Sequence, residues 1–519
     1  MKKALLVMAA MTTLPSLCAA QPGALDALLG ENWYGVYMNG QKAGYSTSRV
    51  SRDDQGRVHV VEDAKFQVAM SGSRQDMRVF SERVYTADGA LIEIISEVVD
   101  PAQVSRFHAM VSDGELLLES TVGGVVKETT LPAPNETVND ALHLGLWARG
   151  TPQVGDVINF SVFEPLYAQE VAGVSRVVGV EERVFNGVPT KVYHVRTAID
   201  LMAIDSQSFV TETGLTLEDE VAGILTQRLE PEDIAKDVSY SNDVIVSNAA
   251  LVETPVQDPR NRERLRLALR GPVNENHTFN DDRQRMANRG DHYEFLSRRA
   301  DLDAFEPALL PVTEEGVIRH LKPTAFIQSD HPKLLEKARE IAGEEKNTLE
   351  ISRRLCKWVH DNVRSSFSAR LSNALEVLEH REGDCTEHSV LFIGLARAAG
   401  IPAREVAGLI YIGGAQPGFY FHQWAAVWVG RWVDVDPTFD QPAADATHVK
   451  LAEGDLYRQA RIIPIIGNLK IEVLPDDGPD LFAEAAAAEA AAQPDEKGAG
   501  EPEPESAGAD APAAEKAGG

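Results

Sequence analysis

Residues 383–400 read GDCTEHSVLFIGLARAAG, and this stretch decides the character of the second half of the chain. Almost every position from Cys385 to Ala399 is apolar or small, which predicts a buried helix that ends at Gly400. Asp384 stands at the position of an N-cap. Cys385 is therefore expected at the N-terminus of a buried helix, where the partial positive charge favours a thiolate over a thiol.

Two amphipathic helices are predicted upstream of this stretch. The first begins near Asp330, with Pro332 in its first turn, and ends at Gly343. The second is capped near Asn347, and its apolar positions fall on one face. Three strand-like runs rich in aromatic and β-branched residues follow the buried helix: AREVAGLIYI, FYFHQWAAVWV and RWVDVD. This order of elements predicts an α+β domain over residues 325–475.

The N-terminal half is predicted to be β-rich. Short strand-like runs extend from about Asn32 to Asp237, and turn dipeptides such as Asn39-Gly40 and Asp113-Gly114 separate them. We expect a sandwich or a curved antiparallel sheet. The alternating run RLRLALRG would close this β-rich domain, which gives it the bounds 21–271. Residues 272–324 are polar and carry little periodicity, so they are expected to form a connector.

Both ends of the chain carry special segments. Lys2 and Lys3 precede an apolar run and the small residues that end at Ala20, which predicts a cleavable signal peptide over residues 1–20 and a periplasmic or secreted protein. Acylation of Cys18 is the alternative, but Leu17 fits that signal poorly. No later stretch is long and apolar enough to predict a transmembrane segment. Residues 476–519, rich in Ala, Glu and Pro, are expected to be a disordered acidic tail.

Composition excludes some classes of function. A formal charge of -29 and a pI near 4.9 argue against binding of nucleic acid, which requires a basic surface. A length of 519 residues is too great for one hydrophobic core. Only Cys356 and Cys385 would remain after removal of the signal peptide, so a disulfide framework is excluded, although a single disulfide or two inert thiols stay open.

Two downstream residues give Cys385 its chemical context. His422 lies in FYFHQWAAVWV and Asp436 lies in WVDVDPTF, both at strand-like positions. On neighbouring antiparallel strands, an imidazole can take the thiol proton while a carboxylate holds the other ring nitrogen. Cys385, His422 and Asp436 are therefore the candidate nucleophile, base and orienting residue.

These motifs resemble the bacterial transglutaminase-like superfamily, whose core is a circularly related version of the papain fold. The resemblance covers roughly residues 325–445 and rests on RLCKWVHDNV, on GDCTEHSVLFIGLARAAGIPAREVAGLIY, and then on FHQWAAVWV and WVDVDPTF. It implies a papain-like, transglutaminase-like core in which Cys385, His422 and Asp436 occupy the catalytic positions. Ala426 departs from the family pattern, which often has an acid there, so substrate specificity can differ.

The resemblance requires His422 and Asp436 to project from one face of the sheet, which constrains the strand connection near Gly430. A two-residue loop at Gly430-Arg431 would put Asp436 opposite Ala425, whose side chain points away from that of His422. We therefore predict an odd-numbered loop or a bulge near Gly430.

Other assignments remain open at this stage. Asp434 shares side-chain parity with Asp436 and could be the orienting residue. Cys356 and His360 lie four apart on one helix face and could imitate a dyad, although packing and solvated positions are the simpler reading. Trp424 shares the face of His422 and is a candidate aromatic wall.

Zinc is a further alternative. Cys385 and His388 have Cys-x-x-His spacing and, with His422 and Asp436, would give four ligands. Structural zinc sites usually contain more thiolates, and a catalytic site would leave one position open to water, so we expect no metal and no cofactor.

The predicted function is thiol-dependent acyl transfer on protein or peptide amides. Hydrolysis, as in a peptidase or amidase, is slightly favoured over transamidation because water is hard to exclude. The alternative is a non-catalytic periplasmic binding or assembly protein that uses the β-rich domain, with the papain-like core as a scaffold. The sequence gives no indication of oligomeric state or of substrate identity.

Overall fold

The structure is a computed structural model that describes residues 25–492 with short gaps. The gaps are residues 39, 71–72, 101–103, 186, 200–203, 224, 239–248, 367–371, 455–458, 460–461, 463–464 and 466–467. The predicted signal peptide, residues 1–20, and the last part of the predicted tail, residues 493–519, lie outside the described residues.

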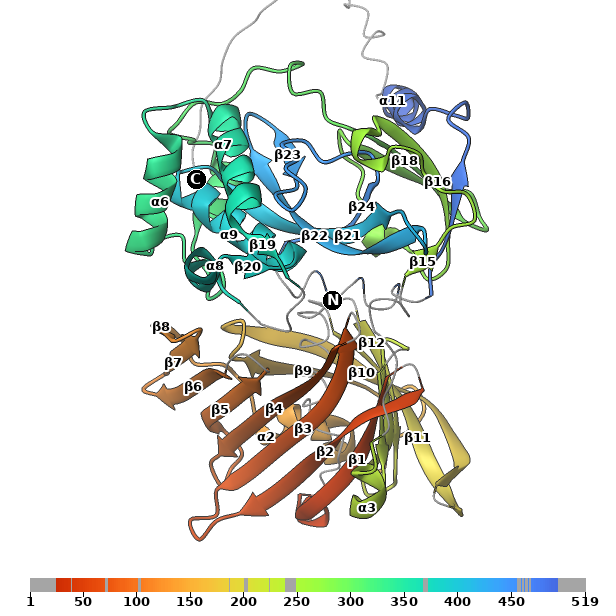
Figure 1. Ribbon diagram of the computed structural model, residues 1–519. Coiled ribbons are helices and arrows are strands. Elements are labelled where there is room, and N and C mark those ends of the chain that lie inside the picture. Colours follow the sequence, from red (N-terminus) through yellow and green to blue (C-terminus); the bar gives the residue numbers. More distant parts are fainter. Residues whose placement is uncertain are drawn as a thin grey trace, which may run out of the picture. The chain divides into compact units, whose positions relative to one another are not determined.

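The N-terminal part forms one antiparallel sheet of 14 strands, in the order β8-β7-β6-β5-β4-β3-β2-β1-β14-β13-β12-β11-β10-β9. Figure 1 shows the sheet curving around the short helix α2 (Val138–Ala141), so the curved antiparallel sheet is confirmed. The strands are β1 (Gly30–Met38), β2 (Gln41–Arg52), β3 (Val58–Met70), β4 (Ser73–Tyr85), β5 (Leu91–Val99), β6 (Val104–Ser112), β7 (Glu115–Val122), β8 (Val125–Pro132), β9 (Val157–Glu164), β10 (Gln169–Phe185), β11 (Val188–Ile199), β12 (Ile204–Val210), β13 (Thr216–Val221) and β14 (Leu225–Leu229).

The hairpin between β6 and β7 has the turn that its sequence predicts. Ser112 pairs with Glu115, which leaves Asp113 and Gly114 as a two-residue loop. Both loop residues have positive φ, 54° and 81°, as a type I′ turn requires. Asp-Gly is favoured there because both residues tolerate this conformation.

The C-terminal part combines helices with a five-stranded sheet. The helices are α6 (Pro332–Ala342), α7 (Thr348–Asn362), α8 (Ala374–His380) and α9 (Cys385–Ala398). The strands are β15 (Ala250–Leu251), β21 (Ala403–Ile412), β22 (Gly418–Trp428), β23 (Trp432–Val435) and β24 (His448–Glu453). The sheet order is β15-β22-β21-β24, and β23 pairs with β22 along the same edge as β15, at the other end of that strand. This arrangement confirms the predicted α+β domain.

Helix α9 is the centre of this domain. It packs against β21 and β22 on one side and against α6, α7 and α8 on the other (Figure 1). Its residues from Thr386 to Ala396 are all buried, which explains why the sequence is apolar around the whole helix. The predicted end of the first preceding helix and the predicted cap of the second are present, whereas the N-cap of α6 is His331 rather than Asp330. Gly343 ends α6, and Asn347 accepts hydrogen bonds from the N–H groups of Leu349 and Glu350 at the start of α7.

A third sheet joins strands from three of the predicted segments. Strand β16 (Arg264–Arg270), assigned from sequence to the β-rich domain, pairs instead with β18 (Tyr293–Arg298) and β25 (Lys470–Leu474), and β17 (Gln284–Asn288) completes the order β17-β18-β16-β25. Residues 264–270 thus pair with strands from residues 272–324 and from the C-terminal domain, and the domain bounds stay predictions. The pairing of β16 with β25 joins distant parts of the chain, which local alternation cannot predict.

Several short elements complete the described chain. They are η1 (Asp26–Leu28), η2 (Leu144–Arg149), α3 (Glu232–Ala235), η3 (Pro259–Asn261), η4 (Glu275–His277), α5 (Glu315–Ile318), η5 (Arg319–Leu321), the parallel pair β19 (Arg364–Ser365) and β20 (Glu382–Gly383), and α11 (Leu481–Ala492). Helix α11 occupies part of the segment predicted as a disordered tail, because its run of Ala and Glu has high helix propensity. Among the described helices, none has both the length and the apolar character needed to cross a bilayer.

Candidate active site

Cys385 is the first residue of α9, and a complete capping box fixes its position. The Asp384 side chain accepts from the N–H of Thr386 at 2.9 Å, and the Glu387 side chain accepts from the N–H of Asp384 at 2.9 Å. A Cβ atom on Gly383 would lie 2.2 Å from the Cβ of Glu387, so this box requires glycine at position 383. The thiol is half-buried at the positive end of the helix.

Ser389 ties the first turn of α9 to the strand that carries His422. Its hydroxyl donates to the carbonyl of Cys385 at 2.7 Å and lies 3.1 Å from the carbonyl of Gln423 in β22. Because Gln423 follows His422 directly, this contact holds the helix start beside the histidine.

The connection between β22 and β23 has the odd-numbered loop that the sequence predicts. Trp428 pairs with Trp432, which leaves the three residues 429–431 as the loop. Gly430 has a φ of +102°, a conformation that residues with a Cβ atom rarely adopt. The three-residue loop therefore depends on glycine at its centre.

The loop sets the register that the candidate site needs. Ala425 pairs with Val435, so the next residue, Asp436, falls in register with Trp424 and on the sheet face of His422, one position from Ala425, where a two-residue loop would place it. The prediction of an odd-numbered loop is confirmed.

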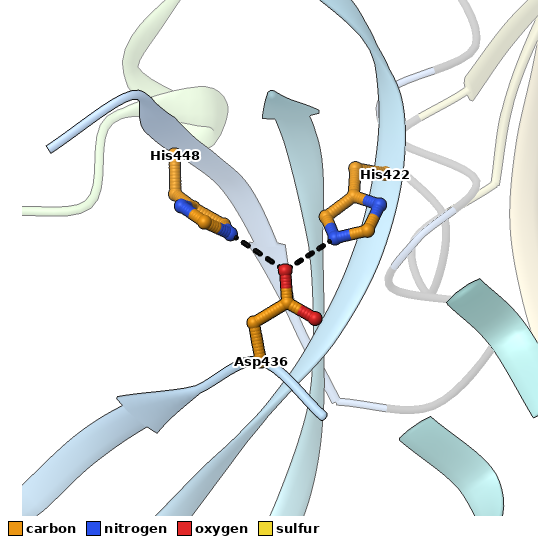
Figure 2. A group of neighbouring side chains, drawn as sticks. All are labelled: His422, Asp436 and His448. Atoms are coloured by element: carbon orange, nitrogen blue, oxygen red, sulfur yellow. Dashed lines mark hydrogen bonds and ion pairs between the residues drawn. The ribbon is translucent and has the colours of Figure 1, made fainter. Parts of the chain in front are cut away.

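His422 and Asp436 are in direct contact. The Nε2 atom of His422 lies 2.8 Å from Oδ2 of Asp436, and both side chains are buried (Figure 2). The other oxygen of Asp436 accepts from the N–H of Thr438 at 2.8 Å. The Nδ1 atom of His422 is the nitrogen left for Cys385.

The electrostatics of these three residues favour an ion pair. Burial by itself lowers the pKa of His422, but the charges of Asp436 and Cys385, with hydrogen bonds to both, raise its pKa to about 10. Burial alone would raise the pKa of Asp436, but His422 and His448 hold the pKa of this carboxyl well below its usual range. An imidazolium beside a sulfur at a helix N-terminus can stabilise a thiolate at neutral pH.

Asp434, the alternative orienting residue, makes other contacts. Its Oδ1 atom pairs with Nζ of Lys450 at 2.9 Å, and its Oδ2 atom accepts from Arg283 and from Nε1 of Trp424, both at 3.1 Å. Asp434 therefore lies in a separate buried ion pair, and Asp436 is the carboxylate that contacts His422.

Trp424 and Ala426 are both fully buried. Trp424 lies beside His422 with ring centroids 6.0 Å apart and an interplanar angle of 21°. This agrees with a shared face, but the buried indole packs beneath the imidazole and presents no accessible wall. Ala426 packs with Trp424 and Val406, so the position where the family often has an acid belongs here to a small apolar cluster.

Cys356 and His360 do not form a dyad. The Cys356 thiol is buried and lies 3.8 Å from the carbonyl oxygen of Asp436, whereas Nδ1 of His360 lies 3.1 Å from the carbonyl of Thr438. Burial, followed by the charge of Asp436, raises the pKa of Cys356 well above its usual value, which makes this thiol unreactive. Cys356 and Cys385 are both free thiols.

The arrangement does not bring together the four candidate zinc ligands. His388 directs its two ring nitrogens at the carbonyls of Asp384, at 2.8 Å, and Val363, at 3.1 Å. Among the described residues, the ligand atoms of His422, Asp436 and His448 converge within 4.8 Å. Their N···O distances of 2.8 and 2.9 Å are those of charge-assisted hydrogen bonds, which account for the group without a metal.

Sequence reasoning missed His448 and Arg283. His448 begins the apolar strand HVKLAE and looks like an ordinary core residue, so no local signal distinguishes it. Arg283 lies in the supposed connector, yet its side chain is buried against Asp434 and the carbonyl of His448. Both residues reach the site only through long-range packing.

Comparison with known proteins identifies the fold of this region. Residues 336–437 match the Transglutaminase-like superfamily model, which confirms the resemblance seen in the sequence. A search of the curated proteins found no match.

Three solved structures show weaker similarity. A candidate cysteine protease from Cytophaga hutchinsonii is 19% identical, with 42% of this chain and 88% of that chain covered and a TM-score of 0.29. A β-barrel-like protein of a domain of unknown function, DUF1849, from Brucella abortus is 11% identical, with 38% and 94% covered and a TM-score of 0.31. A candidate protease from Parabacteroides distasonis is 12% identical, with 75% and 65% covered and a TM-score of 0.19.

Proposed function

Because residues 336–437 match the Transglutaminase-like superfamily, we propose that this protein is an exported thiol enzyme that transfers acyl groups from peptide or protein amides. Cys385 is the nucleophile, His422 the base and Asp436 the orienting residue. The observation that carries the proposal is the contact of His422 with Asp436 at 2.8 Å on one side and with Cys385 on the other.

The first half of the reaction forms a thioester. The Cys385 sulfur attacks the amide carbonyl carbon, and the carbonyl electron pair moves onto oxygen. When the tetrahedral intermediate collapses, the C–N bond breaks and the Nδ1 proton of His422 passes to the leaving amine. Asp436 holds Nε2 throughout and thereby keeps Nδ1 directed at the reacting atoms.

The start of α9 supplies a donor for the oxyanion. The capping box uses the N–H groups of Thr386 and Glu387, so we assign the N–H of Cys385 to the developing negative charge. The helix end adds its partial positive charge at the same place.

The second half of the reaction resolves the thioester. In hydrolysis, His422 takes a proton from water, the hydroxide attacks the thioester carbon, and the Cys385 thiolate leaves. We favour hydrolysis over transfer to an amine because the thiol is only half-buried, so water can reach the acyl-enzyme.

The experiment that tests this proposal is labelling by iodoacetate, read by mass spectrometry of the peptides. Wild-type protein should be labelled at Cys385 much faster than a free thiol at neutral pH, and His422→Ala should abolish this excess reactivity. Buried Cys356 serves as the internal control thiol, and His194→Gln, in the 14-stranded sheet, serves as the matched histidine control. A Cys385 that reacts no faster than a free thiol would favour a binding or assembly protein instead.

Export and substrate need their own measurements. N-terminal sequencing of the mature protein should begin at Gln21 if cleavage follows Ala20. Comparison of periplasmic peptides from cells with the wild-type chain and with Cys385→Ala should reveal which amides are cut or joined.

A further inference from the structure

His448 lies on the far side of Asp436 from His422. It is the first residue of β24 and is fully buried. Its Nε2 atom is 2.9 Å from Oδ2 of Asp436, the same oxygen that His422 approaches at 2.8 Å (Figure 2). Two imidazoles therefore share one carboxylate oxygen, and the second of them lies beyond the matched residues 336–437.

The hydrogen-bond partners of His448 define its protonation. Its Nδ1 atom lies 3.1 Å from the carbonyl oxygen of Asp445 and 3.2 Å from Oδ1 of the same residue. Both ring nitrogens thus face acceptor oxygens, since Thr447, Arg260 and Gln441 all donate to the Asp445 carboxylate. A neutral imidazole has a single N–H, so both contacts are satisfied only by an imidazolium.

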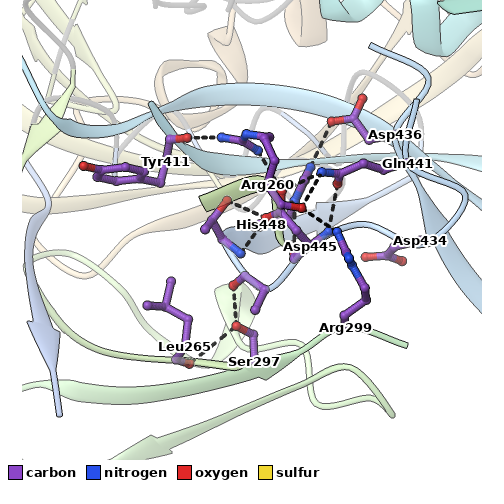
Figure 3. A network of polar contacts seen from close by, with 12 residues as sticks. Arg260, Leu265, Ser297, Arg299, Tyr411, Asp434, Asp436, Gln441, Asp445 and His448 are labelled. Atoms are coloured by element: carbon purple, nitrogen blue, oxygen red, sulfur yellow. Dashed lines mark hydrogen bonds and ion pairs between the residues drawn. The ribbon is translucent and has the colours of Figure 1, made fainter. Parts of the chain in front are cut away.

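Asp445 is itself fixed by several donors (Figure 3). Its Oδ1 atom accepts from the N–H and the hydroxyl of Thr447, at 2.8 and 2.6 Å. Its Oδ2 atom accepts from Arg260 and from Gln441, each at 2.8 Å. The chain of contacts His422, Asp436, His448, Asp445, Arg260 therefore alternates basic and acidic side chains from the candidate active site to a partly exposed arginine.

Other groups also surround His448. Arg283 donates to its carbonyl at 2.6 Å, and the Trp424 ring lies edge-on at 5.1 Å between centroids. Further along β24, Lys450 contacts Asp434, Asp281 and Glu453, at 2.9, 2.7 and 2.8 Å. Arg283 and Lys450 both pair with Asp434, so Asp436 and Asp445 are the described carboxylates that contact the His448 ring.

We propose that His448 is a positioning residue of this active site: as an imidazolium it fixes the Asp436 carboxylate and partly neutralises its charge. This inference rests on the proposed function, since it concerns the same triad. Asp436 would otherwise have one imidazole partner and the freedom to turn about its Cβ–Cγ bond. With donors on both sides of Oδ2 and Thr438 on Oδ1, the carboxylate has a single orientation, and His422 is oriented with it.

The charge on His448 has a measurable consequence. Its ring centroid is 5.7 Å from that of His422, so removal of a positive charge there makes protonated His422 more stable. With an effective dielectric constant near 20, the expected effect is about two pH units. The pH–rate profile of the Cys385–His422 pair should therefore move to higher pH when His448 becomes neutral.

The test compares alkylation of Cys385 by iodoacetate across pH in wild type, His448→Gln and Arg260→Gln. An anionic reagent is used because the positive charge of His422 accelerates its attack on the thiolate. Glutamine keeps an N–H donor toward Asp436 without the charge. The His448→Gln profile should move up by about two pH units, and that of Arg260→Gln by less, since this charge is farther away. His194→Gln should leave the profile unchanged.

The outcomes separate the inference from the proposed function. A slower reaction with an unmoved profile in His448→Gln would mean a merely structural role and would overturn the inference. If His448→Gln does not fold, Arg260→Gln decides. An upward shift of its pH profile supports the inference that the chain of charged contacts acts on His422, and an unmoved profile refutes that inference. Loss of enhanced Cys385 reactivity in the wild type itself would instead refute the proposed function.

Discussion

Replacement of Asp436 by Asn removes the charge on which the candidate site depends while it preserves the shape of the side chain. The N···O contact with His422 is 2.8 Å, and both groups are buried. Charge centres about 4 Å apart interact by about 4 kcal/mol at an effective dielectric constant of 20, which corresponds to about three pKa units. The pKa of His422, about 10 in the wild type, should then fall to near 7.

The assay is again the pH dependence of Cys385 alkylation by iodoacetate. In the wild type, the rate should decline on the alkaline side as His422 loses its proton near pH 10. In Asp436→Asn, the decline should begin about three pH units lower. Turnover of an amide substrate should fall by roughly 10³- to 10⁴-fold, because the amide of Asn can also hold the wrong tautomer of His422.

A matched variant sharpens the result. Asp434→Asn changes a carboxylate two residues away that contacts Lys450 rather than His422, and it should leave the alkaline limb in place. The reasoning fails if Asp436→Asn keeps a limb near pH 10, or if both variants shift it equally. The sign is also opposite to that expected for His448→Gln, so a general disturbance of the site cannot produce both results.

Three further predictions concern the scaffold. Gly430→Ala should lower both the stability in urea unfolding and the reactivity of Cys385, because a Cβ atom there would lie 2.8 Å from the carbonyl oxygen of Glu306. Gly290→Ala is the control: its φ is +96° and no atom lies near its Cβ position, so it should show only the cost of backbone strain. Lys450→Met should destabilise the protein by about 3–5 kcal/mol in the same assay, because it removes one of the two cations paired with buried Asp434 and leaves Oδ1 of that carboxylate without its partner. The melting temperature should drop as pH falls below about 4. The pKa values of Asp436 and Asp445 are lower in the folded protein than in the unfolded chain, so both carboxylates stabilise the fold above their unfolded pKa and this stabilisation is lost on acidification. An unchanged melting temperature at pH 3 would contradict this.

Local signals predicted the parts of the site that lie close to their own motifs. The apolar run after Cys385 predicted α9, and Asp384 was predicted as its N-cap. Strand parity required a loop with an odd number of residues around Gly430, and the pairing of Trp428 with Trp432 has one. In each case the relevant physics acts within a few residues along the chain.

The remainder depended on contacts between distant segments. Strand β16 alternates like any strand, and nothing in RLRLALRG reveals that its partner is β25 rather than a neighbour in the large sheet. His448 stands at the start of an apolar strand, like an ordinary core residue, and Arg283 stands in a polar stretch, like an ordinary surface residue. Their roles follow from the folding of β24 and β17 around Asp436 and Asp434, which alternation and composition do not encode.

The pairing of β16 with β25 also sets the smallest piece of this protein that can be studied alone. A fragment cut at residue 325 would keep every matched residue but would leave β25 without its neighbour and Asp434 without Arg283. Such a fragment would expose an unpaired strand edge, which favours aggregation. A tractable excised domain should therefore start before β15 and extend past Leu474, well outside the matched region at both ends.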